Sequence, residues 1–273
     1  MKLLIYILIG IIFTNSLHAI ENELKMYCEK LDYNYLEKKL DSLKESSNNV
    51  LKYVWHVEIE REIVNDYSEG IIIFDKHIVD TLDNAVFYGD TYKIRYIKNI
   101  NDKLIFCELA QKKYKGVEDD WIEYEVVHFK DSTEEIMKFK SDFKSIYSIP
   151  INMDGLFSTK IAYGWSCGFI GKPPLYRKKL DSLLKNQNRE ELINWVGSPT
   201  LEIQFYAIEG ILTLEKEGVQ FESNVKEMIK IISEKEGFIK SCSGCMSRSV
   251  PIDQQFKYLI KDVNEYNRTR IED

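Results

Sequence analysis

The segment YVWHVEIE, residues 53–60, decides the fold class, because its side chains alternate in character along the chain. Its odd-numbered residues are large and apolar, namely Tyr53, Trp55, Val57 and Ile59. A period of two places such residues on one face of a β-strand and the residues between them on the other face. We therefore expect a half-buried strand here.

Four more segments downstream have the pattern of strands: residues 71–74, 92–96, 104–109 and 121–129. Turn-forming residues from Asn99 to Asp102 separate the second segment from the third, which predicts a β-hairpin. Helical spacing precedes the strands over residues 21–44 and follows them from Ser132 or Thr133 onward. Strands without regular helical crossovers predict an α+β domain, in which an N-terminal antiparallel sheet has flanking helices.

Beyond Pro174 the apolar spacing is helical, and Gly197, Gly218 and Gly237 follow three successive helix patterns. Two helices in roughly 40 residues is the period of HEAT and armadillo arrays. Residues 174–237 therefore resemble helical hairpins of the HEAT/armadillo type, which implies an all-α array with a protein-binding surface. An ordinary helical bundle is the alternative, because so few hairpins do not define a solenoid.

The composition changes near residue 150, since all five prolines lie at or after Pro150. We predict a signal peptide over residues 1–19, an α+β domain over 20–150, a Gly- and Pro-rich connector over 151–174, and a helical domain with a polar C-terminal tail over 175–273. Residues 201–214 are apolar nearly all round, which predicts a central, buried helix.

The N-terminal segment has the order of a signal peptide: Lys2, an unbroken apolar run from Leu3 to Phe13, and a polar stretch that ends at Ala19. The run is shorter than the roughly 20 apolar residues of a membrane-spanning helix. An uncleaved anchor is the alternative. We expect a secreted or periplasmic protein, with no stable membrane insertion after the signal is removed.

The charge balance excludes two classes of partner. The chain has 37 basic and 44 acidic residues, a formal net charge of −7. Nucleic acids and anionic membranes both require a clustered positive face, so we expect neither as a partner. The sequence has no Walker A loop, HExxH motif, EF-hand loop or GxGxxG motif. We therefore expect no cofactor.

The segment GWSCG, residues 164–168, fits the G-x-S-x-G pattern of α/β-hydrolases. That chemistry needs a histidine later in the chain, but all four histidines precede Ser166. The hydrolase interpretation fails, because no base would activate the serine hydroxyl.

The disulfide candidates are Cys167, Cys242 and Cys245, because an exported chain meets an oxidising environment. Cys242 could bond to Cys245, or either of them to Cys167, and the sequence does not choose among these pairings. A zinc site built on the same three cysteines is an alternative. Structural zinc prefers four Cys or His ligands, so we expect no metal site.

A row of polar residues, His56, Glu58, Glu60 and Glu62, would lie on one face of the first strand. We interpret it as a solvated sheet face. A cation site, or a hydrolase site using His56, Glu58 and Glu60, is the alternative.

The function we expect is that of an exported, non-catalytic protein that binds another protein or an envelope component. The alternative function is an exported thiol–disulfide redox enzyme that uses the Cys242/Cys245 pair.

Overall fold

The computed structural model describes residues 19–79, 86–114, 122–168 and 170–270. The expected signal peptide lies outside these residues, apart from Ala19. The chain forms two compact units. The first unit contains the described residues up to Glu58 together with Gly70–Ile136, and the second contains Ile59–Glu69 and the residues from Met137 onward. Within the described ranges, no helix is long and apolar enough to cross a membrane.

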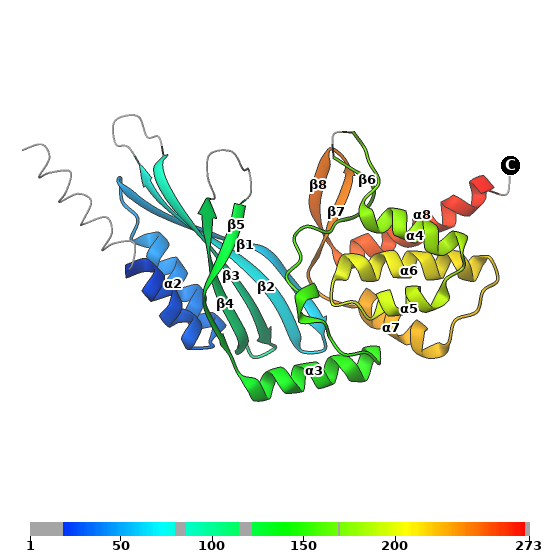
Figure 1. Ribbon diagram of the computed structural model, residues 1–273, viewed down its shortest axis with the longest axis horizontal. Coiled ribbons are helices and arrows are strands. Elements are labelled where there is room, and N and C mark those ends of the chain that lie inside the picture. The colour runs from blue at the N-terminus through cyan, green and yellow to red at the C-terminus, as the bar shows by residue number, and fades with distance from the viewer. Residues whose placement is uncertain (1–18, 80–85, 115–121, 169, 271–273) are drawn as a thin grey trace, which may run out of the picture. The chain divides into compact units, whose positions relative to one another are not determined.

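Five strands follow one another across a sheet in chain order (Figure 1). They are β1 (Leu51–Val64), β2 (Tyr67–Val79), β3 (Val86–Asn99), β4 (Leu104–Tyr114) and β5 (Ile122–Asp131). The predicted hairpin is present as β3 and β4, which pair antiparallel with Ile94 opposite Leu109. Strand β5 pairs antiparallel with β4. The α+β class with an N-terminal antiparallel sheet is therefore confirmed.

Two helices cover one face of this sheet: residues 19–29 and α2 (Tyr33–Glu45) (Figure 1). The helical pattern that the sequence shows over residues 21–44 is interrupted at Leu31, whose φ is 49°. Asp32 then begins α2, because its carboxylate accepts the Tyr35 backbone N–H. Apolar residues of both helices and of the sheet form one core, including Leu24, Leu36, Leu40, Phe74, Tyr92 and Tyr96.

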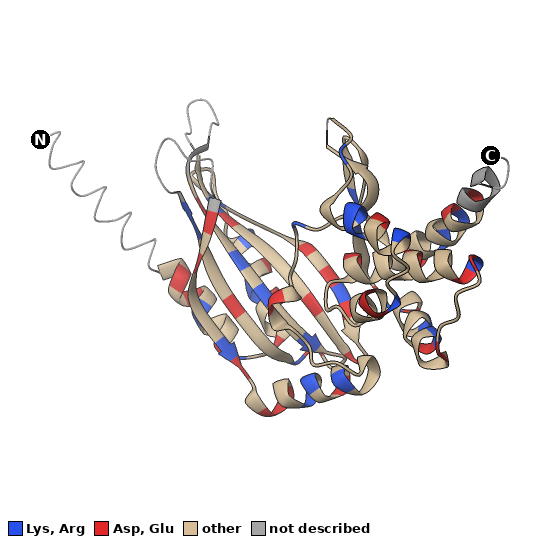
Figure 2. Cartoon of the chain, turned by 45° about the vertical axis from the view of Figure 1, so that its right-hand side comes forward, with Lys and Arg blue, Asp and Glu red and all other residues tan. Residues whose placement is uncertain are grey.

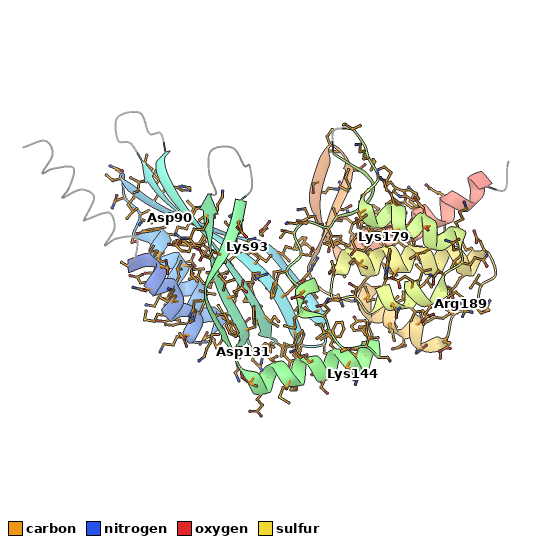
Figure 3. The ribbon with its side chains drawn as sticks, viewed as in Figure 1. Asp90, Lys93, Asp131, Lys144, Lys179 and Arg189 are labelled. Carbon is orange, nitrogen blue, oxygen red and sulfur yellow. A yellow bond between two sulfur atoms is a disulfide. The ribbon has the colours of Figure 1, made fainter. Side chains whose placement is uncertain are left out.

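The residues of β3 that alternate with the core residues lie on the other face of the sheet. On β3, which Figure 3 marks at Lys93, the Lys93 ammonium lies 3.8 Å from the ring centroid of Tyr124. Arg95 donates to the Glu108 carboxylate over 2.6 Å from its Nε atom. Acidic and basic residues are interspersed along the strands and helices in Figure 2. On this face, Lys93 therefore contacts an aromatic ring and Arg95 a carboxylate.

The second unit combines helices with a three-stranded sheet. Its helices are most of α3 (Thr133–Tyr147), then η1 (Met153–Gly155), α4 (Leu175–Lys185), α5 (Arg189–Val196), α6 (Leu201–Lys216), α7 (Ser223–Ser233) and α8 (Ile252–Arg270). Its strands are β6 (Tyr163–Cys167), β7 (Phe238–Gly244) and β8 (Met246–Pro251). The expectation of an all-α C-terminal part is wrong for β7 and β8. Strand β7 pairs in parallel with β6, from the segment expected to be a connector, and antiparallel with β8.

The central element of the second unit is α6, which packs against α4, α5 and α8. It is buried over nearly its whole length, as its apolar sequence predicts. Three long polar side chains are buried with it: Glu202, Gln204 and Glu209. A buried polar group needs a hydrogen-bond partner, so each of these residues is expected to lie in a cluster of buried polar groups.

Candidate binding site

Glu209 lies in the middle of α6 with 5% of its surface exposed. Arg177 of α4 faces it, and Nη1 and Nη2 of Arg177 donate to Oε1 and Oε2 of Glu209 over 2.5 and 2.7 Å. Burial by itself lowers the pKa of Arg177, but the hydrogen bonds and charge of Glu209 outweigh it and raise that pKa above its ordinary value. This two-point ion pair joins α4 to α6.

Two tyrosines add hydrogen bonds here, one to Glu209 and one to the backbone of β6. The Tyr163 hydroxyl donates to Oε2 of Glu209 over 2.7 Å, and burial raises the pKa of Tyr163 well above its ordinary value. The Tyr206 hydroxyl accepts the Gly164 backbone N–H over 3.0 Å. The Arg177 Nε donates to the Gly164 carbonyl over 3.2 Å. Strand β6 is therefore fixed to both α4 and α6.

Gly164 is required by the close approach of β6 to β7. A Cβ atom at this position would lie 2.1 Å from the carbonyl oxygen of Cys242. Any larger residue would therefore push the two strands apart, so the glycine of the GWSCG segment has a packing role.

Trp165 extends from β6 over the ion pair. The guanidinium carbon of Arg177 lies 3.8 Å from the centroid of the Trp165 ring, which is a cation–π contact. Nevertheless, 46% of the Trp165 surface is exposed. An exposed aromatic side chain that is already held in place loses little conformational entropy when a ligand binds to it.

A small cavity lies beside Trp165, with a volume of about 30 Å³. We call it the Trp165 pocket. Its lining residues are Trp165, Arg177, Asp181, Leu184, Glu209, Thr213, Asp262 and Val263. One water molecule needs roughly 10–15 Å³ of such a cavity, so the pocket has room for one small chemical group.

The charges around the Trp165 pocket favour a cation. Arg177 neutralises Glu209, and Asp181 of α4 and Asp262 of α8 add two carboxylates. Burial raises the pKa of Asp262, and the neighbouring Glu209 and Glu265 carboxylates raise it further. A positive group in the pocket would relieve this repulsion. No three His, Cys, Asp or Glu residues in the described part of the chain are arranged to hold a metal ion.

The structure brings together two of the three disulfide candidates. Cys167 of β6 is bonded to Cys242 of β7, with their Cα atoms 5.4 Å apart. Cys245, in the turn between β7 and β8, is exposed and not bonded. Ser166, the would-be nucleophile of the G-x-S-x-G pattern, accepts the Gly244 backbone N–H over 3.3 Å through its hydroxyl oxygen.

The polar row predicted on β1 does not form a uniform solvated face. His56 and Glu58 are exposed, whereas Glu60 and Glu62 are half-buried. Oε2 of Glu62 accepts the Glu236 backbone N–H over 3.2 Å. Burial raises the pKa of Glu62. Glu62 therefore belongs to the packing of the second unit.

A second charged cluster is buried in the second unit, around Arg61, and we call it the Arg61 cluster. The Arg61 Nε donates to Glu69 over 2.7 Å, and its Nη1 donates to Glu202 over 2.8 Å. Gly237 makes room for it, because a Cβ atom there would lie 2.6 Å from the Arg61 Cα. The cluster thus joins the β1–β2 turn region to α6.

Lys235 lies in the same region, and its Nζ donates to Oε1 of Gln204 over 3.1 Å. Burial lowers the pKa of Lys235 to about 7. Its ammonium therefore loses its proton far more readily than an exposed lysine does.

The sequence analysis did not identify Trp165, Arg177 or Glu209 as site residues. The signal that could have found the site was Glu209 itself. Like Glu202 and Gln204, it is a long polar residue in a helix that is otherwise apolar nearly all round, and a buried carboxylate needs a cationic partner.

Comparison with known proteins found no match: no protein-family model, no curated protein and no solved structure matches this chain. No specific family can therefore be assigned to the whole chain, and the likeness to HEAT and armadillo hairpins remains a resemblance in helix spacing.

Proposed function

We propose that this chain is an exported, non-catalytic protein that binds a protein partner, and that the Trp165 pocket receives a lysine side chain of that partner. The observation that supports this proposal best is the exposed Trp165 ring held over a buried ion pair, beside a small cavity with two further carboxylates.

The size and charge of the pocket favour lysine. A cavity of about 30 Å³ fits a compact ammonium group better than a planar guanidinium. Asp181 and Asp262 would accept its hydrogen bonds. The apolar lysine stem would pack along Trp165 and Leu184, as such stems do on apolar surfaces.

Exposed apolar residues close in sequence to Trp165 and to β7 would enlarge the contact with the partner protein. They are Ile170, Leu175 and Met246. Cys167 pairs with Gly244 and is bridged to Lys172, so the segments that bear these residues meet at one end of the small sheet. Binding energy at protein interfaces concentrates in a few anchors such as Trp, with weaker contacts around them.

We further propose that α4 to α7 are a short helical-hairpin array that supports this surface. In support, α4 packs against α5 and α6, and α5 packs against α6 and α7. A rigid set of packed helices suits a binding site whose main residues must be held in place.

The proposal is tested by selecting peptides from a random library on the immobilised full-length chain. We expect enrichment of peptides that contain lysine, and loss of this enrichment with the Trp165→Ala variant. Glu190→Gln, an exposed change on α5, is the matched control and should leave the enrichment unchanged. Selection of peptides without lysine, or equal selection by Trp165→Ala, would contradict the proposal.

The alternative function, thiol–disulfide exchange by Cys242 and Cys245, would require Cys242 to leave its bond with Cys167. Cys242 has only 6% of its surface exposed. External thiols would therefore reach it poorly, and we do not propose this function.

A further inference from the structure

Two cysteines that the sequence analysis did not select, Cys28 and Cys107, lie in the core of the first unit. Both have 0% of their surface exposed and belong to the same apolar cluster. Cys28 is in the helix over residues 19–29, and Cys107 is on β4.

Backbone hydrogen bonds fix the two segments side by side. The Leu104 N–H donates to the Leu31 carbonyl over 3.0 Å, and the Tyr33 N–H donates to the Asp102 carbonyl over 2.9 Å. Cys28 comes three residues before Leu31, and Cys107 comes three residues after Leu104. Burial raises the pKa of the Cys107 thiol, and a hydrogen bond with the Cys28 thiol raises it further. The structure has both cysteines as unbonded, buried thiols that interact with each other.

We propose that Cys28 and Cys107 form a second disulfide bond when the chain folds in the presence of a disulfide oxidant, and that this bond joins the N-terminal helix to β4. With Cys167 bonded to Cys242, Cys245 is then the one cysteine left with a free thiol. The inference concerns the thiols alone and does not depend on the Trp165 pocket.

The reaction transfers two electrons from the two thiols to the oxidant. One cysteine thiolate attacks a sulfur of the oxidant, so that a mixed disulfide forms and one reduced thiolate leaves. The second cysteine thiolate then attacks the sulfur of the first cysteine. The Cys28–Cys107 bond forms, the mixed disulfide breaks, and the second reduced thiolate leaves. The two cysteine protons pass to the two leaving thiolates.

The burial of both sulfurs determines when during folding this bond can form. A mixed disulfide with an external oxidant cannot fit at a position with no exposed surface, and a raised thiol pKa disfavours the reactive thiolate. The exchange therefore takes place while the chain folds, before the helix has packed on the sheet. Once formed, the bond is shielded from reductants.

The test is to unfold and reduce the full-length chain, refold it in a buffer of oxidised and reduced glutathione, and then block the remaining thiols with N-ethylmaleimide under denaturing conditions, so that buried thiols also react. Trypsin digestion without reductant is followed by mass spectrometry. We expect the peptide of residues 26–30 to be linked to that of residues 104–112, and the maleimide to label Cys245. The Cys245→Ser variant should give the same linkage, which excludes exchange through that exposed thiol.

A refolded chain with a native circular dichroism spectrum in which both Cys28 and Cys107 bear maleimide would overturn the proposal. So would a linkage of either residue to a different cysteine. Because the oxidant is supplied in the test tube, either result is independent of where the protein resides in the cell and of what it binds.

Discussion

Removal of the Cys167–Cys242 bond should destabilise the second unit by an amount that follows from the length of the loop that the bond closes. The two cysteines are 75 residues apart in sequence. In the chain-entropy treatment, a bond that closes a loop of this length lowers the entropy of the unfolded chain enough to stabilise the folded state by about 4 kcal/mol. The double variant Cys167→Ala and Cys242→Ala removes this constraint without adding a polar group.

The assay is equilibrium unfolding in guanidinium chloride, followed by tryptophan fluorescence. For a chain of this size the free energy of unfolding falls by about 4–5 kcal/mol for each molar of guanidinium, so we expect the midpoint to fall by about 1 M. Cys245→Ala is the matched control, because Cys245 is exposed and not bonded. It should leave the midpoint unchanged.

Under reducing conditions the wild type and the double variant should unfold at the same midpoint, because neither then has the Cys167–Cys242 bond. A double variant that unfolds at the wild-type midpoint, while mass spectrometry shows the bond in the oxidised wild type, would refute the reasoning.

Three further outcomes are expected. Glu209→Gln leaves Arg177 charged and without its ionic partner, so the free energy of unfolding in urea should fall by about 3 kcal/mol. The double variant Arg177→Met with Glu209→Met should lose less stability than Glu209→Gln. A double variant that loses as much stability as Glu209→Gln, or more, would contradict this. Burial lowers the pKa of Lys235 from 10.5 to about 7, so the unfolded chain binds more protons between these values, and wild-type stability should rise over that pH range relative to Lys235→Met; a pH-independent difference would contradict this. Gly164→Ala should lower the melting temperature by several degrees, because its Cβ would overlap the Cys242 carbonyl; an unchanged melting temperature would show that β6 can shift freely.

Local patterns in the sequence were enough to predict most elements of the fold. Alternation predicted the β3–β4 hairpin, and apolar spacing followed by Gly197, Gly218 and Gly237 predicted α5, α6 and α7. The strand β7 could not be predicted in this way, because its sequence FIKSCSG has no regular alternation and its parallel partner β6 lies more than 70 residues earlier. Neither strand has a regular alternation of its own, so only their meeting in space identifies them.

The candidate binding site could not be predicted from the sequence for a related reason. Glu209 indicates a buried partner, but several cationic residues could have supplied it, and only the packing of α4 against α6 selects Arg177. The cysteines show the same limit. The sequence left open whether Cys242 bonds to Cys245 or either of them to Cys167, and the structure bonds Cys242 to the distant Cys167.

The proposed binding of lysine by the Trp165 pocket is tested most directly by nuclear magnetic resonance on protein with isotope-labelled tryptophan. The protein is titrated with Nα-acetyl-lysine amide, and in parallel with Nα-acetyl-norleucine amide, which has nearly the same side-chain length without the charge. We predict a saturable shift of the Trp165 indole N–H signal with the lysine compound only, and its loss when Asp181→Asn and Asp262→Asn are combined. An equal response to the two compounds, or no response of Trp165 to either, would contradict a lysine-binding role for this pocket.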